Sequence, residues 1–341
     1  MQGLRYRVIR LMLETIARLR LDHALAPRFR GRGVILTFHH VRPDPLSILP
    51  ENAGLSITPQ FLDAVLKLLR QLDYDILPLG HVASRLTAPE TTRPFAVLTF
   101  DDGYRDNRDY AAPILRQYAA PYTMFVCPGF AERTAPLWWL DLEAAVMRLD
   151  RVRVALPGGD FVAETGTPEA KITGLRALYW RLRQEDEATL RVAVSTLARE
   201  TGIDPEARVA ELCMDWDELR AFSDNLLVNI GAHTLTHPRL AKLDADAARL
   251  EMAGSRDRIL HEMGIDARHF AYPVGDPTSA GPRDFALAGE VGFEAAVTTV
   301  PGILKSQSAP LALPRISVNG LYQDPRYLKA LISGVPFALK K

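Results

Sequence analysis

The stretch FAVLTFDDGY at residues 95–104 joins an apolar segment, typical of a buried strand, directly to a pair of acidic side chains. The apolar run from Phe95 to Phe100 has the length and composition of a strand that is buried on both faces. Asp101 and Asp102 follow it at once. Two neighbouring carboxylates are costly to bury unless a cation or a shared proton offsets their charge. An Asp-Gly turn is the alternative interpretation, since this dipeptide is common in turns.

Similar apolar runs recur along the chain, and amphipathic segments follow most of them. The expected strands are VILTF (34–38), FAVLTF (95–100), YTMFVCP (122–128), LLVNIGAH (226–233), HFAYPV (269–274), EAAVTTV (294–300) and SVN near Ser317. Strands that alternate with helices are typical of parallel βαβ units, and six or seven such units fit a closed (β/α) barrel better than a short open sheet. The chemistry of a parallel barrel lies at the carboxyl ends of its strands, where Asp101, Asp102 and His233 fall.

The alternation stops between about Ala131 and Met214. This stretch includes a charged helical segment from Pro168 to Glu200, and we interpret it as a mainly helical insertion on the barrel. Trp138 and Trp139 within it could stack on sugar rings, although core packing is the more common use of aromatic residues. We therefore expect a basic helical extension (1–32), a barrel (33–320) and a C-terminal tail (321–341).

The bulk composition is that of an ordinary globular protein. Of 341 residues, 48% are hydrophobic and 24% are charged, which leaves ample material for a core. Lysine plus arginine equals aspartate plus glutamate, 41 each, so the overall charge gives no reason to expect a nucleic-acid partner. The two cysteines, Cys127 and Cys213, lie too far apart for a CxxC site, and we expect buried thiols.

The N-terminal segment is basic and has a helical pattern. Arg10, Glu14 and Arg18 interrupt it before an apolar core typical of a signal peptide or a membrane span can form. We therefore predict a cytoplasmic protein. The local excess of arginine could bring this helix to an anionic membrane surface as a peripheral contact, but a helix packed on the domain is the favoured interpretation.

A second chemical signal is GAHTLTHPRL at residues 231–240. His233 and His237 are four residues apart, so on one helical turn both imidazoles would face the same way. Such a pair can bind one metal ion, and zinc accepts both histidine nitrogen and carboxylate oxygen. An isolated HxxxH pattern is weak evidence, because exposed or capping histidines are common.

The histidine pair and the aspartate pair together form a complete catalytic set. Two histidines and one aspartate supply the three protein ligands of a catalytic zinc site. Asp102 is the preferred third ligand, and its charge is then neutralised by the metal. Asp101 remains free to accept a proton from the attacking water.

The motifs TFDDGY, HTLTH and FAYPVG resemble, in this order, the first three motifs of the polysaccharide deacetylase, or NodB-homology, family. The resemblance covers about Gly33 to Asn319, apart from the insertion. It implies a distorted (β/α) barrel that removes N- or O-acetyl groups from sugars with a divalent metal, usually Zn²⁺. The site residues that it implies are Asp101 as base; Asp102, His233 and His237 as metal ligands; and the backbone N–H groups near Tyr272 and Pro273 as oxyanion donors.

The chain departs from the family pattern at two positions. Many members have an arginine in the third motif that orients the base, where this sequence has Ala271; Arg315 is our candidate for that role. Many members also have a late histidine as general acid, which is missing here. One branch, typified by poly-N-acetylglucosamine deacetylases, instead has a Phe-His or Tyr-His pair on the first strand, and TFHHV at residues 37–41 is similar to it. His39 is then the expected acid, and His40 should point elsewhere.

We therefore expect a metal-dependent hydrolase that removes N-acetyl groups from an N-acetylhexosamine-containing poly- or oligosaccharide. The expected partner is the acetylated carbohydrate, with no nucleic acid. Two alternatives remain, because a fold does not guarantee an activity. One is a non-catalytic carbohydrate-binding barrel, and the other is a metal hydrolase of a different amide or ester.

Overall fold

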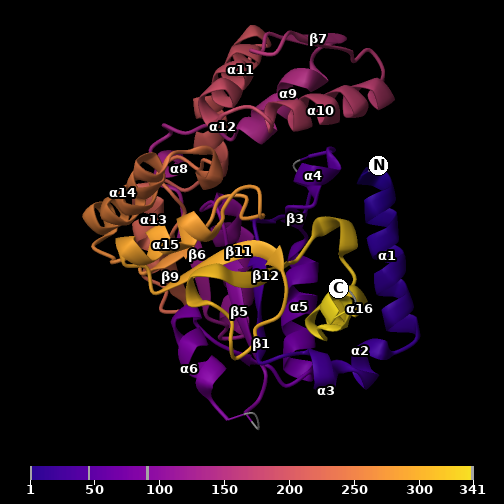
Figure 1. Ribbon diagram of the computed structural model, residues 1–341, viewed down its shortest axis with the longest axis vertical. Coiled ribbons are helices and arrows are strands. Elements are labelled where there is room, and N and C mark those ends of the chain that lie inside the picture. The colour runs from indigo at the N-terminus through magenta and orange to yellow at the C-terminus, as the bar shows by residue number, and fades with distance from the viewer. Residues whose placement is uncertain (1, 45–46, 90–91, 339–341) are drawn as a thin grey trace.

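A closed barrel of parallel strands is the centre of the fold (Figure 1). The computed structural model describes residues 2–44, 47–89 and 92–338. The sheet closes because β1 (Gly33–Phe38) pairs with β5 (Phe95–Phe100) on one side and with β12 (Leu313–Ser317) on the other. From β12 round to β5 the order is β11 (Ala295–Pro301), β10 (His269–Ala271), β9 (Val228–Ala232) and β6 (Tyr122–Val126). The predicted (β/α) barrel is confirmed.

The barrel is distorted on the side of its later strands. β10 is only three residues long and meets β9 at a single register pair, Phe270 with Ala232. The register between β11 and β12 shifts between Val297 and Pro301. Three small pairings complete the strands: β4 (Asp75–Ile76) on β5, β2 (His40–Val41) with β3 (Ser56–Ile57), and the hairpin of β7 (Arg151–Val154) and β8 (Phe161–Glu164).

Helices surround the barrel on its outer side. The longer ones are α5 (Pro59–Gln71), α13 (Trp216–Ser223), α14 (Ala245–Met263), α15 (Pro282–Val291) and α16 (Pro325–Ile332). The shorter ones are α4 (Pro50–Ala53), α6 (Val82–Thr87), α7 (Ala112–Gln117), α8 (Pro128–Ala131), the π-helix η2 (Asn107–Ala111) and the 3₁₀ turns η1 (Leu79–His81), η3 (Leu240–Lys242), η4 (Pro310–Ala312) and η5 (Gly320–Tyr322). The start of α5 follows from its sequence. The Thr58 hydroxyl caps the first turn by accepting a hydrogen bond from the Phe61 N–H, and Pro59 occupies the first helical position.

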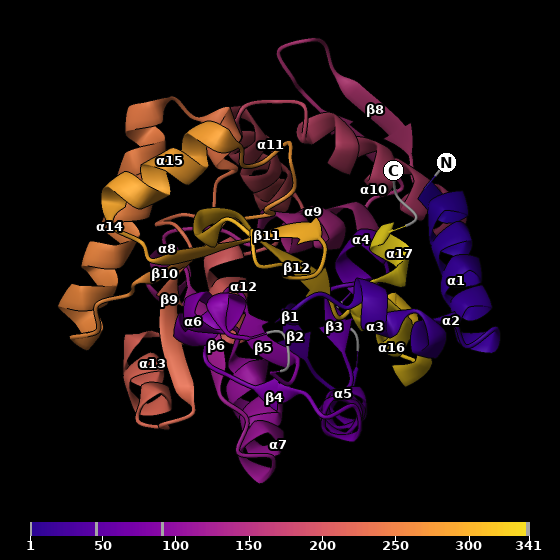
Figure 2. The ribbon, with the colours of Figure 1, turned by 60° about the horizontal axis from the view of Figure 1, so that its bottom comes forward.

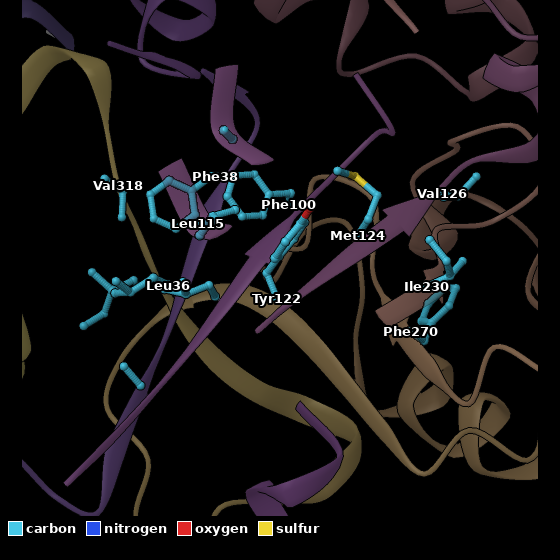
Figure 3. Packing of buried hydrophobic residues seen from close by; sticks show 14 of the residues in the cluster. Leu36, Phe38, Phe100, Leu115, Tyr122, Met124, Val126, Ile230, Phe270 and Val318 are labelled. Carbon is cyan, nitrogen blue, oxygen red and sulfur yellow. The ribbon is translucent and has the colours of Figure 1, made fainter. Parts of the chain in front are cut away.

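Alternation along the strands decides which side chains enter the barrel. One buried cluster takes a residue from each of six barrel strands, namely Ile35, Val97, Phe125, Ala271, Val297 and Leu313. Their sequence neighbours, such as Leu36 and Met124, pack outward beneath the helices (Figure 3). The same period places residues 39, 101 and 315 on the inner side. Residues 39 and 101 come just beyond the carboxyl ends of β1 and β5, and residue 315 is in the middle of β12.

The segment between α8 and α13 forms a helical layer of its own above the barrel in Figure 1. It contains the β7–β8 hairpin, α9 (Trp138–Met147), α10 (Pro168–Leu182), α11 (Glu187–Glu200) and α12 (Pro205–Leu212). A separate buried cluster joins these helices, with Leu142, Leu175 and Leu190 among its members. The charged segment predicted over Pro168–Glu200 is two helices rather than one, because Asp186 caps a second start by accepting from the Thr189 N–H.

The N-terminal helix α1 (Gln2–Arg18) lies beside the C-terminal helices α16 and α17 (Val335–Ala338), as Figure 2 shows. Two short helices, α2 (Leu21–Ala24) and α3 (Ala26–Phe29), lead from it to the barrel. Leu13 and Ile16 of α1 are buried in a cluster with Ala330 of α16 and Val335 of α17, so α1 packs on the domain, as the favoured interpretation predicts. This packed face gives no support to the alternative, a peripheral membrane contact. Within the described ranges, each helix is too short or too polar to cross a lipid bilayer.

A buried carboxylate, Glu143 of α9, fastens the helical layer to the barrel segment before β3. It accepts hydrogen bonds from the Ser47 hydroxyl, from the Ile48 N–H at 2.8 Å and from the Asn52 side-chain amide at 2.9 Å. The Asn52 amide also donates to the Trp139 carbonyl at 3.2 Å. This network fixes the position of α9 over the mouth of the barrel.

We expect Glu143→Ala to lower the free energy of unfolding by about 3 kcal/mol, because it leaves several buried donors without an acceptor. Urea denaturation measures the change. Glu164→Ala on the exposed hairpin is the matched control and should change stability by less than about 0.5 kcal/mol. Equal changes in the two variants would contradict a fastening role for Glu143.

Candidate functional site

Asp101 and Asp102 are both buried where β5 ends, at 2% and 3% exposure. Asp101 continues the inward alternation of the strand, and its backbone N–H still donates to the Phe38 carbonyl of β1. Asp102 adopts a left-handed conformation with a φ of 73°, as does Gly103 with a φ of 69°. The chain therefore does turn at Asp102 and Gly103, and this turn directs the two neighbouring carboxylates toward different partners.

Arg315 of β12 is the partner of Asp101 inside the barrel. Its guanidinium makes two parallel hydrogen bonds, at 2.8 Å to Asp101 Oδ1 and at 2.7 Å to Oδ2. Further bonds to the Thr298 carbonyl and the Thr99 hydroxyl hold the fully buried arginine in place. Burial opposes the charged form of Asp101, but Arg315 outweighs it and keeps the pKa of this carboxyl below its usual value.

The partners of Asp102 are the two histidines that follow β9. The Nε2 atoms of His233 and His237 each lie 3.4 Å from Asp102 Oδ1. Burial opposes ionisation of Asp102, but the imidazoles outweigh it and lower its pKa. Burial also lowers the pKa of His237, to about 3, so this imidazole is neutral and its nitrogen is free to act as a ligand.

The chemistry of this cluster fits a divalent metal ion. The ligand atoms of Asp102, His233 and His237 all lie within 4.8 Å of one another. Asp102 Oδ1 is buried and has no hydrogen-bond partner among the described residues. His233 Nδ1 donates to the Ala271 carbonyl at 2.7 Å, so Nε2 is the ring nitrogen that faces the cluster. One carboxylate oxygen and two imidazole nitrogens are the donor set of a catalytic zinc site with an open position.

The backbone between the two histidines differs from the prediction. His233 and His237 do not share a helical turn, because the chain after β9 is a loop in which Thr234 and His237 have φ values of 61° and 62°. The Thr234 hydroxyl accepts a hydrogen bond from the His237 N–H at 3.0 Å and stabilises this reversal. The left-handed conformations of Thr234 and His237, and not a helical turn, bring the two imidazoles together.

The two histidines after β1 lie on opposite sides of the barrel wall. His39 faces inward, with its Nε2 atom 3.8 Å from Asp101 Oδ2, and its side chain is 18% exposed. Burial lowers the pKa of His39 against the opposing charges of Asp101 and Asp102. His40 points away, with Nδ1 2.7 Å from Asp106 and its ring stacked on Tyr104.

We predicted the oxyanion donors among the backbone N–H groups near Tyr272 and Pro273, and these two residues themselves have no N–H available. The Tyr272 N–H donates to the Val297 carbonyl of β11, its hydroxyl donates to the Leu311 carbonyl, and Pro273 has no N–H. Val274, the next residue, lines the pocket, and none of the hydrogen bonds found within the described ranges uses its N–H. Its φ of 61° is unusual for a β-branched residue and marks strain beside the cluster.

One pocket of about 240 Å³ brings these groups together. His39, Asp101, Asp102, His233 and His237 all line it, whereas Arg315 lies beneath it. Part of the wall comes from the helical layer, which contributes Trp138, Trp139, Tyr179 and Arg183. The sequence drew attention to the two tryptophans, but no local pattern singled out Val274, Tyr179 or Arg183.

Residues 88–294 match the family model described as polysaccharide deacetylase. The chain belongs to the polysaccharide deacetylase family. Among curated proteins of described function, none matches this deacetylase-family sequence significantly.

Solved structures of deacetylases share the fold of this family member. The deacetylase PplD from Streptococcus pyogenes, solved with acetate, has a TM-score of 0.56 at 19% identity, over 87% of this chain and 96% of its own. IcaB from Ammonifex degensii has a TM-score of 0.54 at 18% identity, over 89% and 98%. The polysaccharide deacetylase BC0361 from Bacillus cereus has a TM-score of 0.55 at 14% identity, over 88% and 68%. At these identities the likeness establishes the fold.

We expect the protein to bind one equivalent of Zn²⁺, and Asp102→Asn to weaken that binding by more than about a hundredfold, because the charged ligand of the cluster is lost. Titration calorimetry on metal-free protein measures both. The neighbouring variant Asp101→Asn is the control and should keep one equivalent. Retention of tight binding by Asp102→Asn would show that the ion is held elsewhere.

Proposed function

We propose that this protein is a metal-dependent deacetylase that removes N-acetyl groups from N-acetylhexosamine-containing poly- or oligosaccharides. One observation carries the proposal. Two adjacent carboxylates border the same pocket with different partners: Asp102 has two imidazole nitrogens, and Asp101 has a buried arginine. This division separates a metal ligand from a base, as amide hydrolysis with water requires.

The cluster and the base would act on the same acetamide. A divalent ion held by Asp102, His233 and His237 would supply a Lewis acid that polarises the acetyl carbonyl and acidifies the attacking water. Asp101 removes a proton from that water as its oxygen adds to the carbonyl carbon. Because Arg315 holds both oxygens of Asp101, the carboxylate meets the water in one orientation.

His39 is the proposed donor to the leaving amine. Its lowered pKa leaves the resting imidazole neutral, so the proton reaches it from Asp101, whose Oδ2 lies 3.8 Å from Nε2. His39 passes that proton to the nitrogen as the C–N bond breaks, and acetate and a free amine result. We propose the Val274 N–H, in place of Tyr272, as the backbone donor to the tetrahedral oxyanion, since it borders the pocket and is unpaired in the described structure.

Acetate release decides between this proposal and its alternatives. The zinc-loaded protein should release acetate from N-acetylglucosamine oligomers, measured by an enzyme-coupled acetate assay. If the protein binds metal and hydrolyses other amides or esters but releases no acetate, the proposed substrate would be wrong. The protein would then be a metal hydrolase of a different amide or ester. A protein that neither binds metal nor releases acetate would be a carbohydrate-binding barrel, and the proposal would be wrong.

Asp101→Asn should lower kcat by about a hundredfold to ten-thousandfold, because the amide cannot accept the proton from water. The variant should keep the metal content of the parent, which separates loss of the base from loss of the ion. Steady-state kinetics together with metal analysis measure both quantities. Normal turnover in Asp101→Asn would refute the base assignment.

Arg315→Lys tests how the base is tuned. The guanidinium favours the ionised form of Asp101. A lysine ammonium cannot make the same two parallel hydrogen bonds, so the replacement should raise the pKa of Asp101. Activity requires the ionised base and falls as pH drops through this pKa. The acidic limb of the kcat/KM profile should therefore move to higher pH. An unmoved limb, with activity lowered equally at every pH, would indicate a purely structural arginine.

A further inference from the structure

We infer that the pocket accepts one terminal N-acetylhexosamine residue, so that the enzyme acts at a chain end or on a short saccharide instead of on internal residues of a polymer. This inference rests on the proposed function. It starts from the walls of the pocket, which are built from residues outside the metal cluster and the base.

The wall on the side of the helical layer is aromatic and close to the cluster. The rings of Trp138 and Tyr179 stack with their centroids 5.4 Å apart, and the Trp139 ring lies 5.1 Å from that of His237. Trp138 and Trp139 are each only 7% exposed. Flat aromatic faces with a small open area suit the apolar face of one pyranose ring.

Ion pairs fix this wall against the rim of the barrel. Arg239, in the loop after His237, donates from Nε to Glu187 Oε1 at 2.5 Å, and both side chains are buried. Arg191 of α11 donates to the Thr236 carbonyl, and Arg183 Nη2 lies 3.4 Å from Asp276 Oδ2 in the loop after β10. The buried pair of Arg239 and Glu187 resists opening, since separating it leaves two charges without partners.

A second part of the wall adjoins the aromatic part and is also held in place. Asn52 and Leu55, from the segment between β2 and β3, line the pocket, and the Asn52 amide is held by Glu143 and the Trp139 carbonyl. The helical layer and this segment therefore join each other across one side of the metal cluster. An open groove for a polymer would need an exit on both sides of the reacting sugar, and this junction closes one of them.

The size of the pocket agrees with a single sugar. Its volume of about 240 Å³ lies below the roughly 300–1,000 Å³ of pockets that enclose drug-sized ligands. One hexosamine residue with its acetamide group is smaller than a drug-sized ligand, whereas three consecutive sugar residues are larger than one. The rest of a longer chain would have to leave the pocket from one end of the bound residue.

Mapping the products tests this inference. The zinc-loaded full-length protein is incubated with the N-acetylglucosamine tetramer, and tandem mass spectrometry locates the free amine. We expect one deacetylation at a terminal residue. Amines at internal positions would overturn the single-residue pocket while leaving the deacetylase proposal intact. No acetate from the monomer, the tetramer or a longer polymer would overturn the proposed function, and this inference with it.

Binding gives a readout that does not depend on turnover. Tryptophan fluorescence of the metal-free protein should report dissociation constants for the N-acetylglucosamine monomer and tetramer that agree within about threefold, since one residue makes most of the contacts. Trp138→Ala should weaken both about threefold to tenfold, whereas Tyr110→Ala on the outer surface should change neither. A tetramer bound more than about tenfold tighter than the monomer would indicate several subsites and contradict the inference.

Discussion

Two buried carboxylates stand side by side at the end of β5, and their charges must be offset separately. Arg315 donates two hydrogen bonds to Asp101 from within the barrel. Asp102 turns away through its left-handed backbone and meets the nitrogens of His233 and His237. Without these partners the pair would carry the cost of uncompensated buried charge. The division of one acidic dipeptide between an arginine and a pair of imidazoles underlies both the stability of the site and its proposed chemistry.

The barrel makes this division feasible because parallel strands end on one side. Alternation along β1, β5 and β12 directs His39, Asp101 and Arg315 inward. The register of the closed sheet places Asp101 level with His39 and Arg315 deeper in the barrel, beneath Asp101. The helical layer then adds the aromatic wall above them. The barrel therefore supplies the reacting groups, while the added helices limit what can reach them.

The sequence predicted the features that depend on local pattern. Strand periodicity and the order of the motifs were enough for the barrel and for the candidate residues at its strand ends, and the structure places Asp102, His233 and His237 within reach of one ion. The contact of Arg315 with Asp101 was a hypothesis that no spacing could establish, because 214 residues separate them. The division of the chain into extension, barrel and tail stays a prediction.

Local pattern failed where backbone conformation or distant packing decides the outcome. The histidine spacing suggested a helical turn, but left-handed Thr234 and His237 bring the imidazoles together. Tyr272 had the right place in its motif, yet the ladder between β10 and β11 uses its N–H, so Val274 is the available donor. Tyr179 enters the pocket only because α10 folds back over the barrel, which no short window of sequence encodes.

The proposed chemistry requires one divalent ion to be shared by Asp102, His233 and His237, while Asp101 stays outside its coordination sphere. Anomalous diffraction from a zinc-soaked crystal tests this most directly. We expect a single strong peak within bonding distance of both Nε2 atoms and of a carboxylate oxygen of Asp102, with Asp101 still bound by Arg315. A peak coordinated by Asp101, or no peak at this cluster, would contradict it.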